Sequence, residues 1–227
     1  LFSTAQKRFT ADVEQQAEKI LSQMTLDEKL SYIGGINWMY TRPLERLGIP
    51  RLKMSDGPQG LGTHGPSTAY PCALMLAATW NEQLATEYGS ALGKDCRARG
   101  VHVVLGPAVN IYRAPMCGRN FEYMGEDPYL SATMVVPYIK GVQENGVAAC
   151  VKHYALNNQE FNRHTTNVQL SIVLFMKYTC LLLKRLFRKV EHGRLWALII
   201  SIRESTPVTT NACFEIFFAM NGALMAS

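Results

Sequence analysis

Hydrophobic positions in the first forty residues recur with the spacing of amphipathic helices. Residues 11–24 carry apolar side chains at a 3.6-residue period, which predicts a helix. Thr25 follows, and Glu28 stands three residues further on. A threonine and a glutamate at this spacing predict the capping box of a second helix.

Beyond residue 40 the pattern changes to short apolar runs that are each followed by a polar, often glycine-rich loop. Runs at residues 52–54, 101–105 and 146–151 precede, in turn, Ser55-Asp56-Gly57-Pro58, Gly106-Pro107-Ala108-Val109-Asn110 and Lys152-His153-Tyr154. Short apolar runs of this kind predict buried strands.

Helical patterns at residues 81–99 and 132–145 separate these runs. The first is expected to bury a face made of Leu84, Tyr88, Leu92 and Cys96. Buried strands that alternate with amphipathic helices predict an α/β fold with a parallel sheet or barrel. In such folds the chemistry lies in loops at the carboxyl ends of the strands, where the polar clusters of this chain fall.

Composition narrows the class of protein. The chain has 227 residues, of which 48% are hydrophobic and 18% charged, so disordered, collagen-like and coiled-coil proteins are excluded. No apolar run reaches the roughly 20 residues of a membrane span, so none is expected. The net charge of +5 comes mainly from residues 172–227, which contain seven Lys and Arg residues but only three Asp and Glu residues.

The six cysteines are scattered, with no Cys-x-x-Cys pair and no histidine at metal-ligand spacing. They are interpreted as small core residues rather than as a disulfide framework or a zinc site. No metal and no cofactor is expected.

Three charged residues after the predicted strands each allow two interpretations. Asp56, before Gly57-Pro58, either stabilises a local turn or accepts hydrogen bonds from vicinal hydroxyls of a ligand. Arg119 and Glu122 either form an ion pair that holds a loop or line a binding site.

Lys152 and His153 follow directly on a predicted buried strand, which favours two donors that line a cleft over core packing. Asn157, Asn158, Glu160 and Arg163 come next, either as support for the site or as a salt-bridged helix start. Many donors and acceptors, without a phosphate loop or metal ligands, suggest an uncharged, polyhydroxylated ligand such as a sugar.

Seven segments together resemble one family. They are Leu47–Pro50 running on to Ser55–Pro58, Thr68-Ala69-Tyr70-Pro71, Leu76–Asn81, Leu105–Ile111, Gly118-Arg119-Asn120-Phe121-Glu122, Gly125-Glu126-Asp127-Pro128 and Val151-Lys152-His153-Tyr154. Their order and spacing over about residues 10–171 are similar to the N-terminal barrel domain of glycoside hydrolase family 3.

The resemblance implies an incomplete (β/α)8 TIM-type barrel and an exo-acting, retaining β-glucosidase that acts on a small oligosaccharide or β-glucoside. Asp56 would hold hydroxyls of the terminal sugar, and Arg119, Lys152 and His153 would complete the subsite. Neither nucleic acid nor membrane is an expected partner, and secreted or periplasmic location is typical of the family. One departure is Gly62, where family members often carry an arginine after the Asp-Gly-Pro turn. Residues 155–160 differ from the Gly-rich loop of the family's N-acetylglucosaminidase branch.

The resemblance stops after Ser171, and residues 172–203 form an apolar and basic stretch without clean periodicity. Joining the third base of each codon to the first two of the next allows family-like segments there. At four pairs of neighbouring residues the shifted frame can encode only one amino acid, and in each case it is the amino acid found in the family motif. Met176-Lys177 and Met220-Asn221 can give only Glu, and Trp196-Ala197 and Met225-Ala226 only Gly.

Residues 1–171 are therefore interpreted as the N-terminal part of the barrel domain, and residues 172–227 as its out-of-frame continuation. The family's nucleophilic Asp and its acid/base Glu are expected beyond Ser227, which would make this chain an inactive fragment of an enzyme. The alternatives are a genuinely divergent tail, a catalytically vestigial half-barrel that binds carbohydrate, and a basic interaction protein, which rests only on the charge of the tail.

Overall fold

The computed structural model describes residues 15–153, 156–163, 165–166, 168, 171–180, 182 and 195–197. By its contacts the chain divides into two compact units, Leu1–Met54 and Ser55–Ser227. No helix in these described segments is long and apolar enough to cross a membrane.

The first unit contains the two predicted helices. Residues 15–23 are helical, and α2 spans Leu26–Ile33; residues 11–14 of the first helix lie outside the described residues. The capping box is confirmed, because the Glu28 amide donates to Thr25 Oγ1 (3.2 Å) and the Thr25 amide donates to Glu28 Oε2 (2.8 Å). A 3-10 turn, η1 (Glu45–Leu47), follows α2 in this unit.

The second unit is built on a sheet with the strand order β1-β2-β3-β4. The strands are β1 (Met54–Asp56), β2 (Val103–Leu105), β3 (Ala148–Val151) and β4 (Leu195–Ala197). β3 runs parallel to both of its neighbours. Ala149 of β3 lies opposite Val104 of β2 on one side and opposite Leu195 of β4 on the other. The parallel sheet confirms the expected α/β class.

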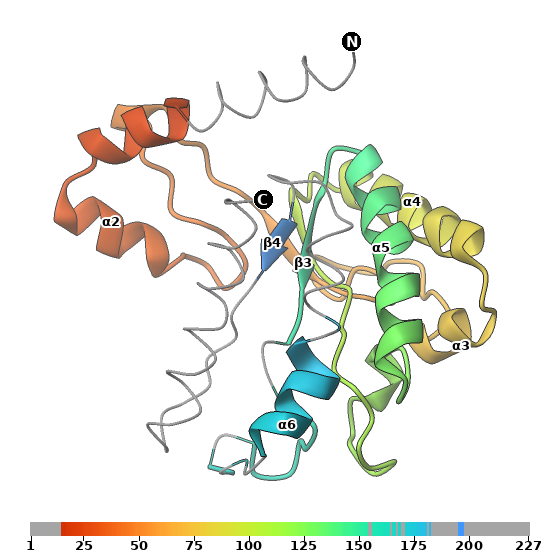
Figure 1. The fold of residues 1–227 in the computed structure, drawn as a ribbon. Helices are drawn as coiled ribbons and strands as arrows, with labels where there is room; N and C mark the ends of the chain where they lie inside the picture. The colour runs from red at the N-terminus through yellow and green to blue at the C-terminus, as the bar shows by residue number, and fades with distance from the viewer. Residues whose placement is uncertain are drawn as a thin grey trace. The chain divides into compact units, whose positions relative to one another are not determined.

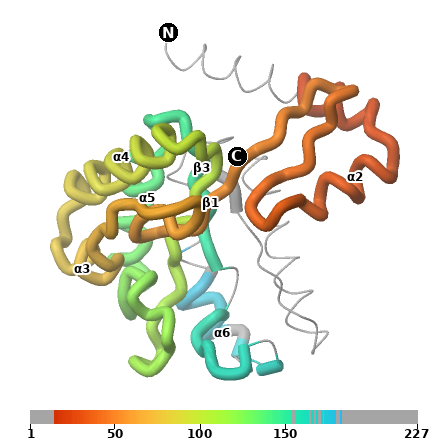
Figure 2. The backbone as a smooth tube through the Cα atoms, turned by 180° about the vertical axis from the view of Figure 1, so that it is seen from behind, coloured from red at the N-terminus to blue at the C-terminus, as the bar shows by residue number. Residues whose placement is uncertain are grey.

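Helices cover one face of this sheet. Figures 1 and 2 show α3 (Ala73–Ala78), α4 (Glu82–Ala98) and α5 (Pro128–Glu144) together on the same side of β3. The short helix η2 (Asn120–Glu122) lies in the loop before α5, and α6 (Ile172–Phe175) continues into a π-helical turn, η3 (Met176–Cys180). The main core lies between the helices and the sheet and includes Leu92, Val104, Val135 and Ala149.

Small residues let α4 and α5 approach closely. A Cβ atom at Gly89 would collide with the Tyr138 carbonyl on α5, and one at Gly141 would collide with the Thr86 carbonyl on α4. These glycines therefore set the distance between the two helices, and with it the position of the strands beneath them.

The helix expected at residues 81–99 is confirmed, with Asn81 as its N-cap: the Leu84 amide donates to Asn81 Oδ1 (3.1 Å). The prediction that Leu84 is buried was wrong, because its side chain is 40% exposed. The face of α4 that packs against α5 is centred on Gly89 and Gly93, where the two helices come closest. Leu84 therefore lies at the edge of the packed face.

Two other expectations differ from the structure. The first strand begins at Met54 rather than at residue 52, so that Asp56 is its last residue instead of part of the following loop. The tail is expected to pack poorly, because its apolar residues lack clean periodicity, but within its described part it forms α6, η3 and β4, and Phe175 and Leu182 are buried. Pairing with the exposed edge of β3 supplies backbone hydrogen bonds that do not depend on side-chain periodicity.

Of the described cysteines, Cys96, Cys117 and Cys150 are buried and Cys72 is partly buried, in line with their interpretation as core residues. The side chains of Cys180 and Cys213 lie outside the described residues.

Candidate active site

The ends of β1 and β3 bring Asp56 and Lys152 together. Lys152 follows β3 directly and forms a parallel bridge with Ala108, which fixes its backbone beside the loop after β2. Its Nζ lies 2.5 Å from Asp56 Oδ1 and 3.3 Å from Glu122 Oε2, and only 2% of its side chain is exposed. A buried ammonium is stable only when it is paired, and here two carboxylates provide that pairing.

Asp56 combines both interpretations drawn from the sequence. Its Oδ1 accepts from the Gly57 amide (3.1 Å) as well as from Lys152, so that one oxygen serves the local turn and the ion pair. The side chain is nevertheless 47% exposed, and Oδ2 has no hydrogen bond to any described residue. One carboxylate oxygen is thus held in place while the other is available to a ligand.

Arg119 and Glu122 form the ion pair that the sequence allowed. Arg119 Nε donates to Glu122 Oε1 (2.7 Å) and Nη2 donates to Oε2 (2.8 Å), which is the bidentate geometry. Burial of Glu122 opposes its ionisation, but the hydrogen bond from Arg119 and the charges of Lys152 and Arg119 outweigh burial and hold the pKa of Glu122 below its ordinary value. Glu122 is therefore a carboxylate at neutral pH.

The loop after β3 extends this network. Glu160 accepts hydrogen bonds from Asn157 Nδ2 (2.8 Å) and Arg163 Nη1 (3.0 Å), and its Oε1 lies 3.9 Å from Arg119 Nε. Residues 161–163 form a turn rather than a helix start, and Glu160 links the ion pair of Arg163 to Arg119. Asn158 donates to the Ile111 carbonyl and ties the loop to the one after β2.

His153 is held by a second set of contacts. Its amide donates to Asn110 Oδ1 (2.9 Å), and its ring Nδ1 lies 3.2 Å from the same oxygen and 3.3 Å from the Tyr123 hydroxyl. Burial, together with the positive charges of Arg119 and Lys152, lowers the pKa of His153 to about 3, so the ring is neutral at pH 7. Its Nε2 is buried and has no partner among the described residues.

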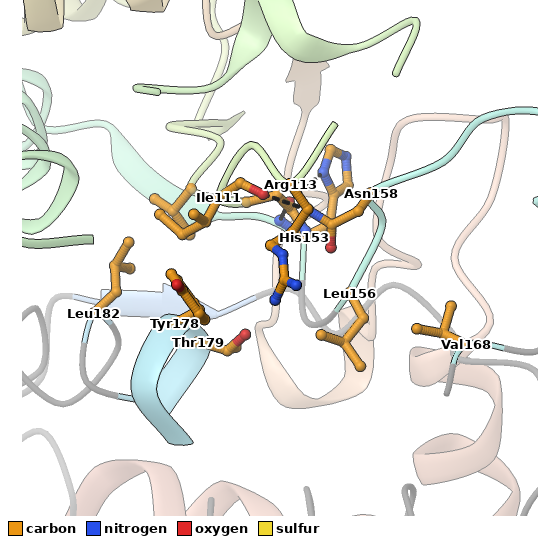
Figure 3. A pocket seen from close by; sticks show the side chains of 11 residues that line it. Ile111, Arg113, His153, Leu156, Asn158, Val168, Tyr178, Thr179 and Leu182 are labelled. Carbon is orange, nitrogen blue, oxygen red and sulfur yellow. Dashed lines mark hydrogen bonds between the residues drawn. The ribbon is translucent and has the colours of Figure 1, made fainter. Parts of the chain in front are cut away.

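A cavity of about 230 Å³ lies beside His153. Figure 3 shows its wall, to which the loops after β2 and β3 contribute Ile111, Arg113 and Asn158 and the tail contributes Tyr178, Thr179 and Leu182. Of the four predicted site residues only His153 lines it. The cavity therefore adjoins the charged cluster without containing it.

The predicted residues Asp56, Arg119, Lys152 and His153 thus converge at the carboxyl ends of β1 and β3. The contacts that buried Asn110 and Tyr123 make with His153 were not predicted from the sequence. The one available signal was the position of Asn110, a polar side chain that closes the loop after an apolar strand.

The charges of the cluster balance. The cluster contains three carboxylates and three cations that pair with one another: Asp56, Glu122 and Glu160 with Lys152, Arg119 and Arg163. Within the described ranges no group of three or more His, Cys, Asp or Glu is placed to hold a metal ion. A neutral network rich in oriented donors and acceptors suits an uncharged ligand with several hydroxyls. Fold and site together define an α/β domain with a parallel sheet and a polar, charge-balanced cluster at the carboxyl ends of its strands.

The family follows from direct comparison. The family model described as "Glycosyl hydrolase family 3 N terminal domain" matches residues 25–173, and the chain belongs to this family. A curated relative, Beta-glucosidase BoGH3A of Bacteroides ovatus, is 48% identical over 207 residues, which cover 84% of this chain and 27% of that protein. Thermostable beta-glucosidase B of Acetivibrio thermocellus is 47% identical over 162 residues, or 66% of this chain and 22% of that protein. The chain thus spans about a quarter of the length of these relatives.

Solved structures agree. Beta-glucosidase 3B from Thermotoga neapolitana in complex with glucose superimposes with a TM-score of 0.71 at 38% identity, covering 77% of this chain and 28% of that one. The beta-glucosidase from Kluyveromyces marxianus gives a TM-score of 0.75 at 33% identity, over 79% of this chain and 22% of that one. The parallel sheet with helices on one face is accordingly part of the family's (β/α) barrel.

Proposed function

We propose that this chain is part of a retaining β-glucosidase and binds the terminal non-reducing β-D-glucosyl residue through Asp56, Arg119, Lys152 and His153. The observation that carries the proposal is the pairing of Lys152 Nζ with Asp56 Oδ1 at 2.5 Å, which holds a half-exposed carboxylate whose Oδ2 has no hydrogen bond to any described residue. Support comes from relatives named as beta-glucosidases.

Each residue has a chemical part in this proposal. Asp56 Oδ2 accepts hydrogen bonds from sugar hydroxyls, and a charged acceptor strengthens such bonds to about 1.5–3 kcal/mol. Lys152 holds Asp56 in position through the ion pair with Oδ1, while Arg119 fixes Glu122 and adds positive charge near the ligand. His153 offers to a hydroxyl its ring Nε2, which has no hydrogen-bond partner among the described residues.

Retaining hydrolysis needs a nucleophilic carboxylate and a second carboxyl that can carry a proton, about 5–5.5 Å apart. Glu122 is unsuited to carry that proton, because Arg119 and Lys152 lower its pKa. We therefore assign the nucleophile and the acid/base to residues outside this sequence, and interpret residues 172–227 as translated out of frame. In that proposal the chain as given binds glucose without hydrolysing a glucoside.

Glucose binding by the 227-residue chain, measured by ligand-observed NMR, tests the subsite. Asp56→Asn should weaken binding at least about tenfold, which corresponds to about 1.4 kcal/mol. The matched control is Glu144→Gln, an exposed carboxylate at the end of α5, which should leave binding unchanged. Equal binding by Asp56→Asn and wild type would refute the assignment.

The coding DNA downstream of codon 165 tests the rest of the proposal. An alternative open frame that encodes the family segments and continues to a Ser-Asp-Trp motif would support an enzyme whose reading frame is interrupted here. Absence of any alternative frame that encodes these family segments would refute the frame interpretation. Glucose binding without any such downstream motif would favour the vestigial carbohydrate-binding half-barrel.

A further inference from the structure

The surroundings of His153 determine which of its ring nitrogens carries the proton. A backbone amide can only donate, so the Asn110 side-chain atom that the His153 amide contacts at 2.9 Å is the carbonyl oxygen. That oxygen can only accept, and it lies 3.2 Å from His153 Nδ1. Two lone pairs facing each other at this distance would repel, so Nδ1 has to be the protonated nitrogen.

The second neighbour of Nδ1 agrees with this assignment. The Tyr123 hydroxyl, 3.3 Å from Nδ1, donates its proton to the Asn157 carbonyl (3.2 Å), which leaves its oxygen as an acceptor toward His153. Tyr123 is fully buried and its pKa is raised by burial, so the phenol stays protonated. Nδ1 therefore faces two acceptors.

The neutral ring then has a bare lone pair on Nε2. This atom is buried, the residue as a whole is only 6% exposed, and no described residue donates to Nε2. A buried acceptor without a donor costs free energy, which a ligand hydroxyl can recover by donating to it.

We propose that Asn110 is a positioning residue that locks His153 in the Nδ1–H tautomer, so that Nε2 serves only as an acceptor for a sugar hydroxyl. The sugar part of this inference rests on the proposed function, whereas the tautomer rests on geometry alone. The inference makes His153 selective for hydroxyl donors: it rejects a ligand that offers only an acceptor at the same place.

Long-range ¹H–¹⁵N correlation NMR of the 227-residue chain reads the tautomer directly, without any activity. Wild type should show a protonated-type Nδ1 and an unprotonated-type Nε2 resonance for His153. Asn110→Leu, which removes the acceptor at similar volume, should move both resonances toward a mixture of tautomers. Asn110→Asp, which keeps an oxygen acceptor, should restore the wild-type pattern.

Two controls separate the tautomer from general loosening of the loop. Val109→Ala removes buried packing next to Asn110 and should leave the tautomer unchanged. Tyr123→Phe removes the second acceptor but leaves Asn110, and should also preserve Nδ1–H. A wild-type Nε2–H pattern, or an unchanged pattern in a folded Asn110→Leu variant, would overturn the proposal.

Deoxy and deoxyfluoro analogues of glucose test the acceptor function. A fluorine substituent can accept a hydrogen bond but cannot donate one. At the ring position whose hydroxyl donates to Nε2, the deoxy and the deoxyfluoro analogue should therefore bind equally weakly. Neither should cause the change in the His153 Nε2 resonance that glucose causes. Retained affinity of the fluoro analogues at every position where the deoxy sugars bind weakly would overturn the acceptor function. A locked Nδ1–H tautomer in a chain that binds no glucose would support the positioning by Asn110 and contradict the proposed function, so the two failures are distinguishable.

Discussion

Lys152 Nζ lies 2.5 Å from Asp56 Oδ1, although 96 positions separate the two residues in the chain. The contact joins the carboxyl ends of β1 and β3, which are not neighbours in the sheet because β2 lies between them. A lysine is long enough to span this distance, and its burial means that the pair contributes to the stability of the domain as well as to the site.

Lys152→Met should therefore destabilise the chain by about 3 kcal/mol, because it removes the ammonium and leaves buried Glu122 with Arg119 as its only cation in contact among the described residues. Asp56→Asn should cost less, about 1 kcal/mol, because Asp56 is half exposed. Urea denaturation measures both. Lys94→Met, on the exposed side of α4, is the control and should change stability by less than about 0.5 kcal/mol. Equal stability of Lys152→Met and the control would contradict the pairing.

His153 should make the chain less stable in acid. Its pKa is lowered from 6.5 to about 3 in the folded state, so below pH 6.5 the unfolded chain takes up a proton that the folded chain does not. This contribution is fully present above pH 6.5 and is lost as the pH falls from 6.5 toward about 3. His153→Gln should reduce the slope of unfolding free energy against pH in this window by about 1.4 kcal/mol per pH unit. His64→Asn, at an exposed position, is the control, and a slope unchanged by His153→Gln would contradict the buried neutral ring.

Tyr88 and Tyr138 should act together on the turn that carries Asp56. Tyr138, on α5, donates its hydroxyl proton to the Pro58 carbonyl (3.2 Å), and Tyr88, on α4, shares its one hydroxyl proton between the carbonyls of Pro58 (3.1 Å) and Pro71 (2.9 Å). Either single Phe variant leaves one donor, so each should cost about 1 kcal/mol or less, whereas the double variant leaves the carbonyl without either phenol and should cost more than the sum. A double-mutant cycle by thermal denaturation measures this coupling. Strict additivity would show that the two phenols do not share the carbonyl.

Gly89→Ala should separate α4 from α5. The added methyl group would meet the Tyr138 carbonyl, which is backbone and cannot rotate away, so a loss of about 3 kcal/mol or more is expected. Gly34→Ala is a suitable control because its Cβ would meet no atom closer than 3.6 Å. Calorimetry of the two variants decides the point, and equal melting temperatures would mean that the helices can move apart without cost.

The sequence predicted the elements whose signals are local. Thr25 and Glu28 lie three residues apart and interact within one helical turn, so their pattern was sufficient to predict the capping box. Leu84 was misplaced because helical periodicity gives the width of an apolar face but not its direction, which depends on how closely α5 approaches at Gly89 and Gly93. The strand in the tail was missed because pairing with β3 depends on an available strand edge and leaves no periodic pattern in three residues.

By itself the sequence determined the α/β class, the family, and the four residues expected at the sugar subsite. Strand ends and family motifs consist of residues that are adjacent in the chain, so they can be recognised without the structure. Only the tertiary structure decided what those residues do to one another. Lys152 binds Asp56 and Glu122, and Asn110 accepts from both nitrogens that His153 presents to it. The physical reason is that the electrostatic interactions of a charge or a lone pair are strongest with groups within about 3–4 Å of it. Those neighbours come from strands and loops dozens of residues away.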